Sequence, residues 1–188
     1  MSQFLIRTFT SLSMLVGFMV ISGCNMSLFE NTNIKDVVEK VSDGDTLILR
    51  DGSGEKHKVR LGCIDAPEIP HSHKQKRSKK RRDMNQFNWG VRAKNRLAQL
   101  IKNSGRRVKI NVVDQDEYGR KVIELRLRDD TLVQEVLLTE GLAKVHPEYM
   151  KLCSSKDIML QAQTQAQRQK IGIWGDDEFI NPWEYRKL

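Results

Sequence analysis

Three short apolar segments come before any helical pattern in this chain, and turn-forming residues separate them. The apolar segments lie at residues 37–41, 46–49 and 59–64, and the turns between them read Ser-Asp-Gly-Asp at 42–45 and Asp-Gly-Ser-Gly at 51–54. Asp-Gly pairs between apolar runs are typical of tight hairpins. The domain is therefore predicted to begin with three consecutive strands.

One amphipathic helix is inserted after these strands. In residues 90–102 apolar side chains recur every three or four positions, which is the helical period. Two more strands are expected at 108–112 and 122–127, and two more helices at 131–140 and 155–170. The helix at 131–140 is expected to begin with a capping box from Thr131 to Gln134. The order predicts an α+β, mainly β fold: a five-stranded OB-fold Greek-key barrel with about three packed helices.

The composition excludes several classes of protein. The chain has 188 residues, a formal net charge of +8, 30% charged residues and three cysteines. It is too polar for a multi-span membrane protein and too poor in cysteine for a small disulfide scaffold. The basic balance favours anionic partners such as nucleic acid or acidic lipid.

The N-terminus reads as a targeting segment. An apolar run at 12–21 is too short to span a bilayer comfortably, and it ends in Ser-Gly-Cys24, which resembles a bacterial lipobox. We therefore expect a lipoprotein signal peptide at 1–23, lipidation of Cys24 and a tether at 24–33. An ordinary secretory signal and an uncleaved membrane anchor are the alternatives.

This reading places the protein in the cell envelope. A lipid on Cys24 would hold it outside the cytoplasm, at the outer membrane if the cell is Gram-negative. In that compartment Cys63 and Cys153 can form a disulfide, or they can be two buried thiols. We expect a monomer with the barrel domain at 34–175 and a C-terminal tail at 176–188. Two aromatic residues within positions 181–186 favour docking of this tail on the body.

Carboxylates are expected to gather from two separate loops. Asp43 and Asp45 precede the second strand, and Asp65 and Glu68 follow the third. Carboxylate and carbonyl oxygens are the ligands that Ca²⁺ prefers. The alternative is that each motif is only a turn.

Two arginines accompany these acids. Arg60 alternates with apolar residues in the third strand, and Arg120 closes an Asp-Glu-Tyr-Gly-Arg turn. The guanidinium fork matches phosphate oxygens, so a metal ion, two arginines and a free carboxylate would supply what phosphodiester cleavage needs. Alternatively, the arginines are ion-pair partners of the carboxylates.

The motifs together resemble the staphylococcal (micrococcal, thermo-) nuclease family. They occur in family order at residues 41–46 (VSDGDT), 59–68 (VRLGCIDAPE), 116–120 (DEYGR), 141–145 (GLAKV) and 172–174 (GIW). The resemblance implies Ca²⁺-dependent endonucleolytic cleavage of DNA and RNA. It places Ca²⁺ on Asp45, Asp65 and the backbone carbonyl of Ala66, a position where the family often has threonine.

The same resemblance implies roles for the remaining site residues. Glu68 would be the general base, and Arg60 and Arg120 would hold the scissile phosphate. Tyr118 and Tyr149 are candidates for packing against a base or sugar.

A dense basic segment follows Glu68. Seven cations occur in nine residues: Lys74, Lys76, Arg77, Lys79, Lys80, Arg81 and Arg82. We expect a mobile basic loop that binds nucleic acid, with a merely solvated loop or attraction to anionic lipid as alternatives. The alternative function for the whole chain is a non-catalytic nucleic-acid-binding OB-fold lipoprotein at the cell surface.

Overall fold

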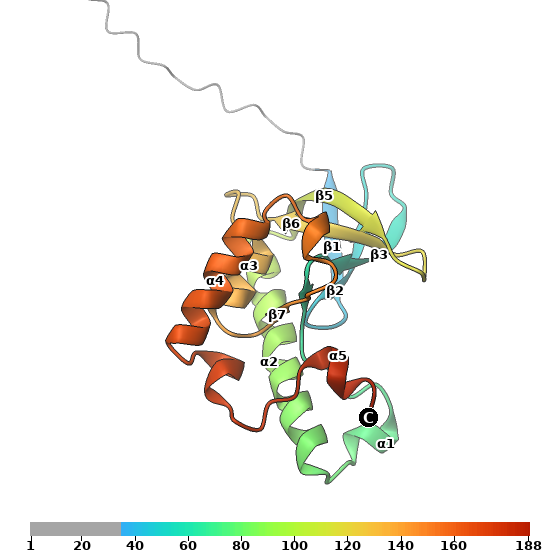
Figure 1. The fold of residues 1–188 in the computed structure, drawn as a ribbon. Helices are drawn as coiled ribbons and strands as arrows, with labels where there is room; N and C mark the ends of the chain where they lie inside the picture. Colours follow the sequence, from blue (N-terminus) through green and yellow to red (C-terminus); the bar gives the residue numbers. More distant parts are fainter. Residues whose placement is uncertain (1–34) are drawn as a thin grey trace, which may run out of the picture. The chain divides into compact units, whose positions relative to one another are not determined.

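Five strands close into a barrel, as the sequence predicts (Figure 1). The computed structural model describes residues 35–188, so the predicted signal peptide, Cys24 and the tether lie outside the described residues. The barrel strands, in their order around the barrel, are β1 (Asp36–Val41), β2 (Thr46–Arg50), β3 (Lys56–Leu61), β6 (Lys121–Arg126) and β5 (Arg107–Gln115).

The barrel closes through one parallel pair of strands. β3 runs parallel to β6, with Arg60 opposite Val122, while the other neighbouring pairs are antiparallel. Parallel neighbours need a long connection, and α2 lies within it. The pairing brings the turn before β6, which carries Arg120, alongside β3.

The third predicted strand is interrupted. The sequence pattern predicts one strand over 59–64, but β3 ends at Leu61, and Ile64–Asp65 forms the separate strand β4, paired with β7 (Lys144–Val145). The backbone turns at Cys63, whose φ of 63° lies in the left-handed region. This turn carries Asp65 out of the barrel ladder.

A disulfide anchors this turn. Cys63 is bonded to Cys153, across 90 residues of sequence and a Cα–Cα distance of 6.2 Å. The bond joins the start of β4 to the segment that leads into α4. Both cysteines are buried.

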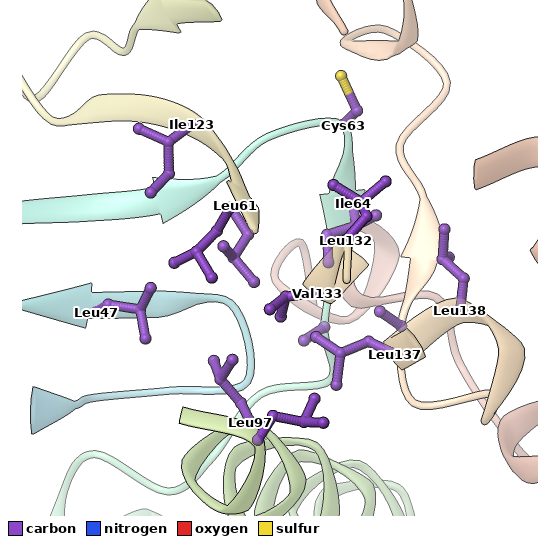
Figure 2. Packing of buried hydrophobic residues seen from close by; sticks show 14 of the residues in the cluster. Leu47, Leu61, Cys63, Ile64, Leu97, Ile123, Leu132, Val133, Leu137 and Leu138 are labelled. Carbon is purple, nitrogen blue, oxygen red and sulfur yellow. The ribbon is translucent and has the colours of Figure 1, made fainter. Parts of the chain in front are cut away.

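Helices cover one end and one side of the barrel (Figure 1). They are α1 (His73–Lys76), α2 (Arg81–Asn103), α3 (Val133–Thr139), α4 (Lys156–Arg168) and α5 (Pro182–Tyr185), with 3₁₀ turns η1 (Met150–Leu152) and η2 (Gly172–Gly175). Figure 2 shows Leu47 and Leu61 of the barrel in one buried cluster with Leu97 of α2 and Leu137 of α3. Burial of these side chains joins the helices to the barrel.

Two expectations about the helices are wrong. The basic segment is not an irregular loop, because α1 lies within it and α2 begins at Arg81, well before residue 90. The capping box at the start of α3 is absent, since no side chain caps that helix. Gln134 instead lies buried and binds the backbone of β6, accepting from Leu125 N at 3.2 Å and donating to Ile123 O at 2.9 Å.

No helix within residues 35–188 is both long enough and apolar enough to cross a bilayer.

Candidate active site

The two predicted acidic loops meet because a glycine stands between the aspartates of the first. A Cβ on Gly44 would lie 2.7 Å from the Cβ of Ala66 and 2.9 Å from that of Ala93. Atoms cannot approach so closely, so any larger residue would push the β1–β2 turn away from β4 and α2. The contact allows the Ala66 N–H to donate to Oδ2 of Asp45 at 3.2 Å.

Arg60 joins the two buried aspartates. Asp45 is 4% exposed and Asp65 is fully buried. The Nη2 atom of Arg60 lies 3.0 Å from Oδ2 of Asp45 and 2.6 Å from Oδ1 of Asp65. The charge of Asp45, followed by that of Asp65, raises the pKa of Arg60 above its ordinary value. A single guanidinium therefore bridges both carboxylates and holds them side by side.

Glu68 is positioned by a second glycine contact. The segment after β4 passes so close to α2 that a Cβ on Gly90 would lie 2.1 Å from the Glu68 carbonyl oxygen. The Glu68 side chain remains 21% exposed. Gly90 therefore sets how near the Glu68 backbone can come to α2.

Replacing Gly90 by Ala is expected to displace Glu68 and to destabilise the protein by about 1–3 kcal/mol, the usual cost of overpacking. Helix propensity alone would stabilise the variant by up to about 1 kcal/mol, so the sign of the change separates the two effects. Urea unfolding measures the difference. Asn88→Ala, at an exposed position of the same helix, is the matched control and should not destabilise the fold.

The acidic side of the site carries more negative charge than Arg60 balances. Burial, reinforced by the charge of Asp45, raises the pKa of Asp43 to about 6. His71 Nε2 lies 3.6 Å from Asp43 Oδ2 and 3.8 Å from Glu68 Oε2. Ligand atoms of Asp43, Glu68 and His71 lie within 4.8 Å of one another. Clustered carboxylate oxygens of this kind fit a hard divalent cation, because it relieves their mutual repulsion.

A third arginine reaches the site from the end of the chain. Nη2 of Arg186 lies 2.6 Å from Oδ2 of Asp65, and Nη1 lies 3.1 Å from Oδ1 of Asp65 and 2.7 Å from Oε1 of Glu68. Burial alone would lower the pKa of Arg186, but the hydrogen bonds and charges of Asp65 and Glu68 raise it. The sequence pattern predicts that the tail docks on the body but indicates no function for it. No motif or spacing in the sequence points to Arg186.

Arg120 lies in the turn between β5 and β6 and is held there by its own turn. Its Nε donates to Oδ2 of Asp116 at 2.7 Å, and its guanidinium lies 5.5 Å from the ring centroid of Tyr118. Within residues 35–188, Asp116 is the ion-pair partner of Arg120. The fold thus brings Asp45, Arg60, Asp65 and Glu68 together, and leaves Arg120 on the adjoining turn.

A basic pocket of about 710 Å³ adjoins Arg120. It is lined by Lys56, His57, Lys58, Gln115, Tyr118, Gly119, Arg120 and Lys121. Tyr118 is 75% exposed at its rim. The pocket has both features of a nucleic-acid contact, cations for the backbone and an exposed aromatic ring.

The other predicted contact residues lie at the surface. All seven cations of the basic segment are exposed, in α1, in the link to α2 and in the first turn of α2. Arg81 is paired with Glu178 and Arg82 with Asp83. Tyr149 is 48% exposed, and its ring centroid lies 4.3 Å from that of His146.

Comparison with known proteins agrees with the arrangement of these motifs. Residues 58–176 match the protein family described as Staphylococcal nuclease homologue. The chain belongs to the staphylococcal nuclease family. The matched range includes Arg60, Asp65, Glu68 and Arg120, whereas Asp45 and Arg186 lie outside it.

Individual members of the family are similar over most of the chain. A Haemophilus influenzae protein named uncharacterized endonuclease is 31% identical over 175 residues, covering 93% of this chain and 83% of its own. An Escherichia coli protein of the same name is 28% identical, covering 79% and 82%. A Shigella flexneri protein named micrococcal nuclease is 27% identical, covering 80% and 79%.

Proposed function

We propose that the protein is a calcium-dependent endonuclease that hydrolyses phosphodiester bonds of DNA, RNA or both. The observation that carries the proposal is the contact of Arg60 with both Asp45 and Asp65, beside Glu68. Membership of the nuclease family and the names of the similar proteins support it.

The donor set suits a calcium ion. Asp45, Asp65 and the carbonyl of Ala66 would hold Ca²⁺, and all of these donors are oxygen atoms, as that ion requires. When bound, the ion would neutralise negative charge on the phosphate and orient it.

The protein's own residues accept the proton of the attacking water and bind the phosphate. Glu68, partly exposed beside the buried aspartates, accepts the proton of the attacking water. The water oxygen forms a bond to phosphorus as the bond from phosphorus to the leaving oxygen breaks, and the leaving oxygen takes up a proton from solvent. Arg60 and Arg120 donate to the phosphate oxygens, on which charge accumulates during this exchange. Arg120 reaches the phosphate by exchanging its Asp116 partner for the substrate.

Nucleic acid would extend from this site over basic surface. The pocket at Arg120 and the exposed cations of the basic segment supply partners for successive phosphates, and Tyr118 offers a ring to a base. Because such binding releases counterions, affinity should fall steeply as salt is added.

We further propose that the protein is anchored outside the cytoplasm by a lipid on Cys24. The disulfide between Cys63 and Cys153 supports this location, because such bonds persist in oxidising compartments.

Calcium removal tests the proposed function. Plasmid DNA and total RNA are incubated with the full-length protein in mild detergent, with Ca²⁺ or with chelator. We expect degradation with Ca²⁺ and none with chelator, restored when Ca²⁺ is returned in excess. Digestion that persists with chelator would contradict the calcium requirement. Intact nucleic acid in both reactions, with a salt-sensitive gel shift, would instead support the non-catalytic binding module.

A further inference from the structure

The C-terminal helix places a positive charge directly on the catalytic carboxylates. α5 ends at Tyr185, and the next residue, Arg186, contacts both Asp65 and Glu68. Asp65 lies 121 positions earlier in the chain. The contact therefore depends on how the end of the chain docks on the rest of the fold.

The docking of this helix is specific. The hydroxyl of Tyr185 donates to Oδ1 of Asp83 at 3.1 Å, and its ring meets Phe87 edge to face at 6.0 Å. Asn181 accepts from Nζ of Lys144 at 2.5 Å. Contacts with α2 on one side and β7 on the other hold α5, which Figure 1 shows beside α2. Arg186 therefore starts from a defined position near the carboxylates.

Arg186 takes up bonding capacity that a metal ion would need. Oδ1 of Asp65 accepts from Arg60 and from Arg186, and Oδ2 accepts from Arg186. A carboxylate has about four lone-pair positions, so three of those on Asp65 are in use. A divalent ion on Asp65 would also lie next to the Arg186 charge, and like charges a few ångströms apart repel.

Of the two arginines on Asp65, Arg186 is the one that can leave. Its side chain is 42% exposed, while that of Arg60 is 21% exposed. The Arg186 guanidinium is already partly hydrated, and its departure would leave buried Asp65 still paired with Arg60, so Arg186 can turn into water at a lower cost than Arg60 could. Its departure would free Asp65 and Glu68 together, since one side chain binds both.

We infer that Arg186 is a built-in cation that closes the metal-free active site, competing with the divalent ion for Asp65 and occupying Glu68 until the ion displaces it. This inference rests on the proposed function, because it takes Asp65 as a metal ligand and Glu68 as the base. It adds a residue beyond the segment that matches the family. In this arrangement metal binding also releases the base.

Calcium titration calorimetry of the full-length chain, without nucleic acid, tests the competition. Arg186→Gln is expected to tighten Ca²⁺ binding about tenfold, within the range usual for coupled binding events. Lys187→Gln is the matched control, because it removes the same charge from the exposed neighbouring residue, and it should change the affinity less than about twofold. Arg186→Lys keeps the positive charge but loses the planar guanidinium, so its calcium affinity should lie between those of Arg186→Gln and Lys187→Gln.

Equal calcium affinity in wild-type protein and Arg186→Gln would overturn the inference, and so would weaker binding in the variant. A second readout follows the side chain itself: the ¹⁵N-labelled guanidinium signal of Arg186, assigned by its loss in Arg186→Gln, should shift when Ca²⁺ is added. An unchanged signal at calcium saturation would mean that the arginine stays in place and would overturn the displacement. Thermal unfolding checks that each variant is folded.

Different results would contradict the competition by Arg186 and the proposed nuclease activity. Tighter binding in Arg186→Gln without any hydrolysis would support the competition and contradict the nuclease. Calcium-dependent hydrolysis with equal affinities would retain the nuclease and overturn the competition. If no variant bound Ca²⁺, both the competition and the calcium assignment would be wrong, whatever the activity.

Discussion

Glu68→Gln is expected to lower kcat about 10²- to 10⁴-fold, the range for losing a general acid or base. Glutamine keeps the shape of the side chain and can still accept a hydrogen bond from Arg186, but it cannot take a proton from water. The Asp45–Arg60–Asp65 contacts do not involve Glu68, so Ca²⁺ should still bind. Initial rates of DNA and RNA cleavage at saturating Ca²⁺ measure the loss.

The control for this variant is Glu148→Gln, at an exposed glutamate in the loop before η1, and it should leave kcat unchanged. A Glu68→Gln protein that binds Ca²⁺ and keeps more than about a tenth of the wild-type kcat would show that another group takes the proton. Loss of both calcium binding and activity would point instead to a structural role for Glu68.

Removing the disulfide is expected to have the largest effect on stability. The double variant Cys63→Ala/Cys153→Ala should lose about 2–5 kcal/mol of unfolding free energy, because the bond closes a long loop and restricts the unfolded chain. Alanine leaves no unpaired polar group in the two buried positions. Urea unfolding of the oxidised proteins measures the difference.

Reduced wild-type protein is the control, because it lacks the same bond while keeping both sulfur atoms. It should unfold at nearly the same urea concentration as the double variant. A double variant as stable as oxidised wild type would contradict a stabilising role for the bond. Since Cys63 lies two residues before Asp65, calcium affinity should also weaken in the variant as it approaches unfolding.

The barrel was predictable from sequence because its signals are local. Alternating apolar residues and Asp-Gly turns each occupy a few positions, and five such strands around one inserted helix restrict the topology strongly. The break after β3 was not predictable in this way. Gly62 and Cys63 continue an apolar run, and the positive φ of Cys63 reflects contacts with residues far along the chain, including Cys153.

The errors in the helices have a similar origin. Residues 81–89 are mostly polar, so their pattern resembles a loop, yet Phe87 is buried and Tyr185 packs on it. Gln134 has the spacing of a capping residue, but β6 offers it two backbone partners in the core. In both cases tertiary contacts decide what the local pattern leaves open.

In the candidate site, too, the residues in local motifs were predictable and the residue placed by a distant contact was not. Asp45, Arg60, Asp65 and Glu68 lie in short motifs beside predicted strand ends, and the fold brings them together. Their catalytic roles stay predictions. Arg186 could not be found, because a lone arginine in a short tail has no periodicity or spacing that marks a partner more than a hundred residues away.

The way the barrel closes also bears on how the chain matures. β1 pairs with β2, its immediate neighbour in sequence, and with β5, which begins at Arg107. If the chain is exported from its N-terminus, as proposed above, one edge of β1 would stay unpaired until most of the protein had crossed the membrane, and late contacts of this kind slow folding. Cys153 would arrive later still, so the disulfide can form only after all five barrel strands have left the membrane.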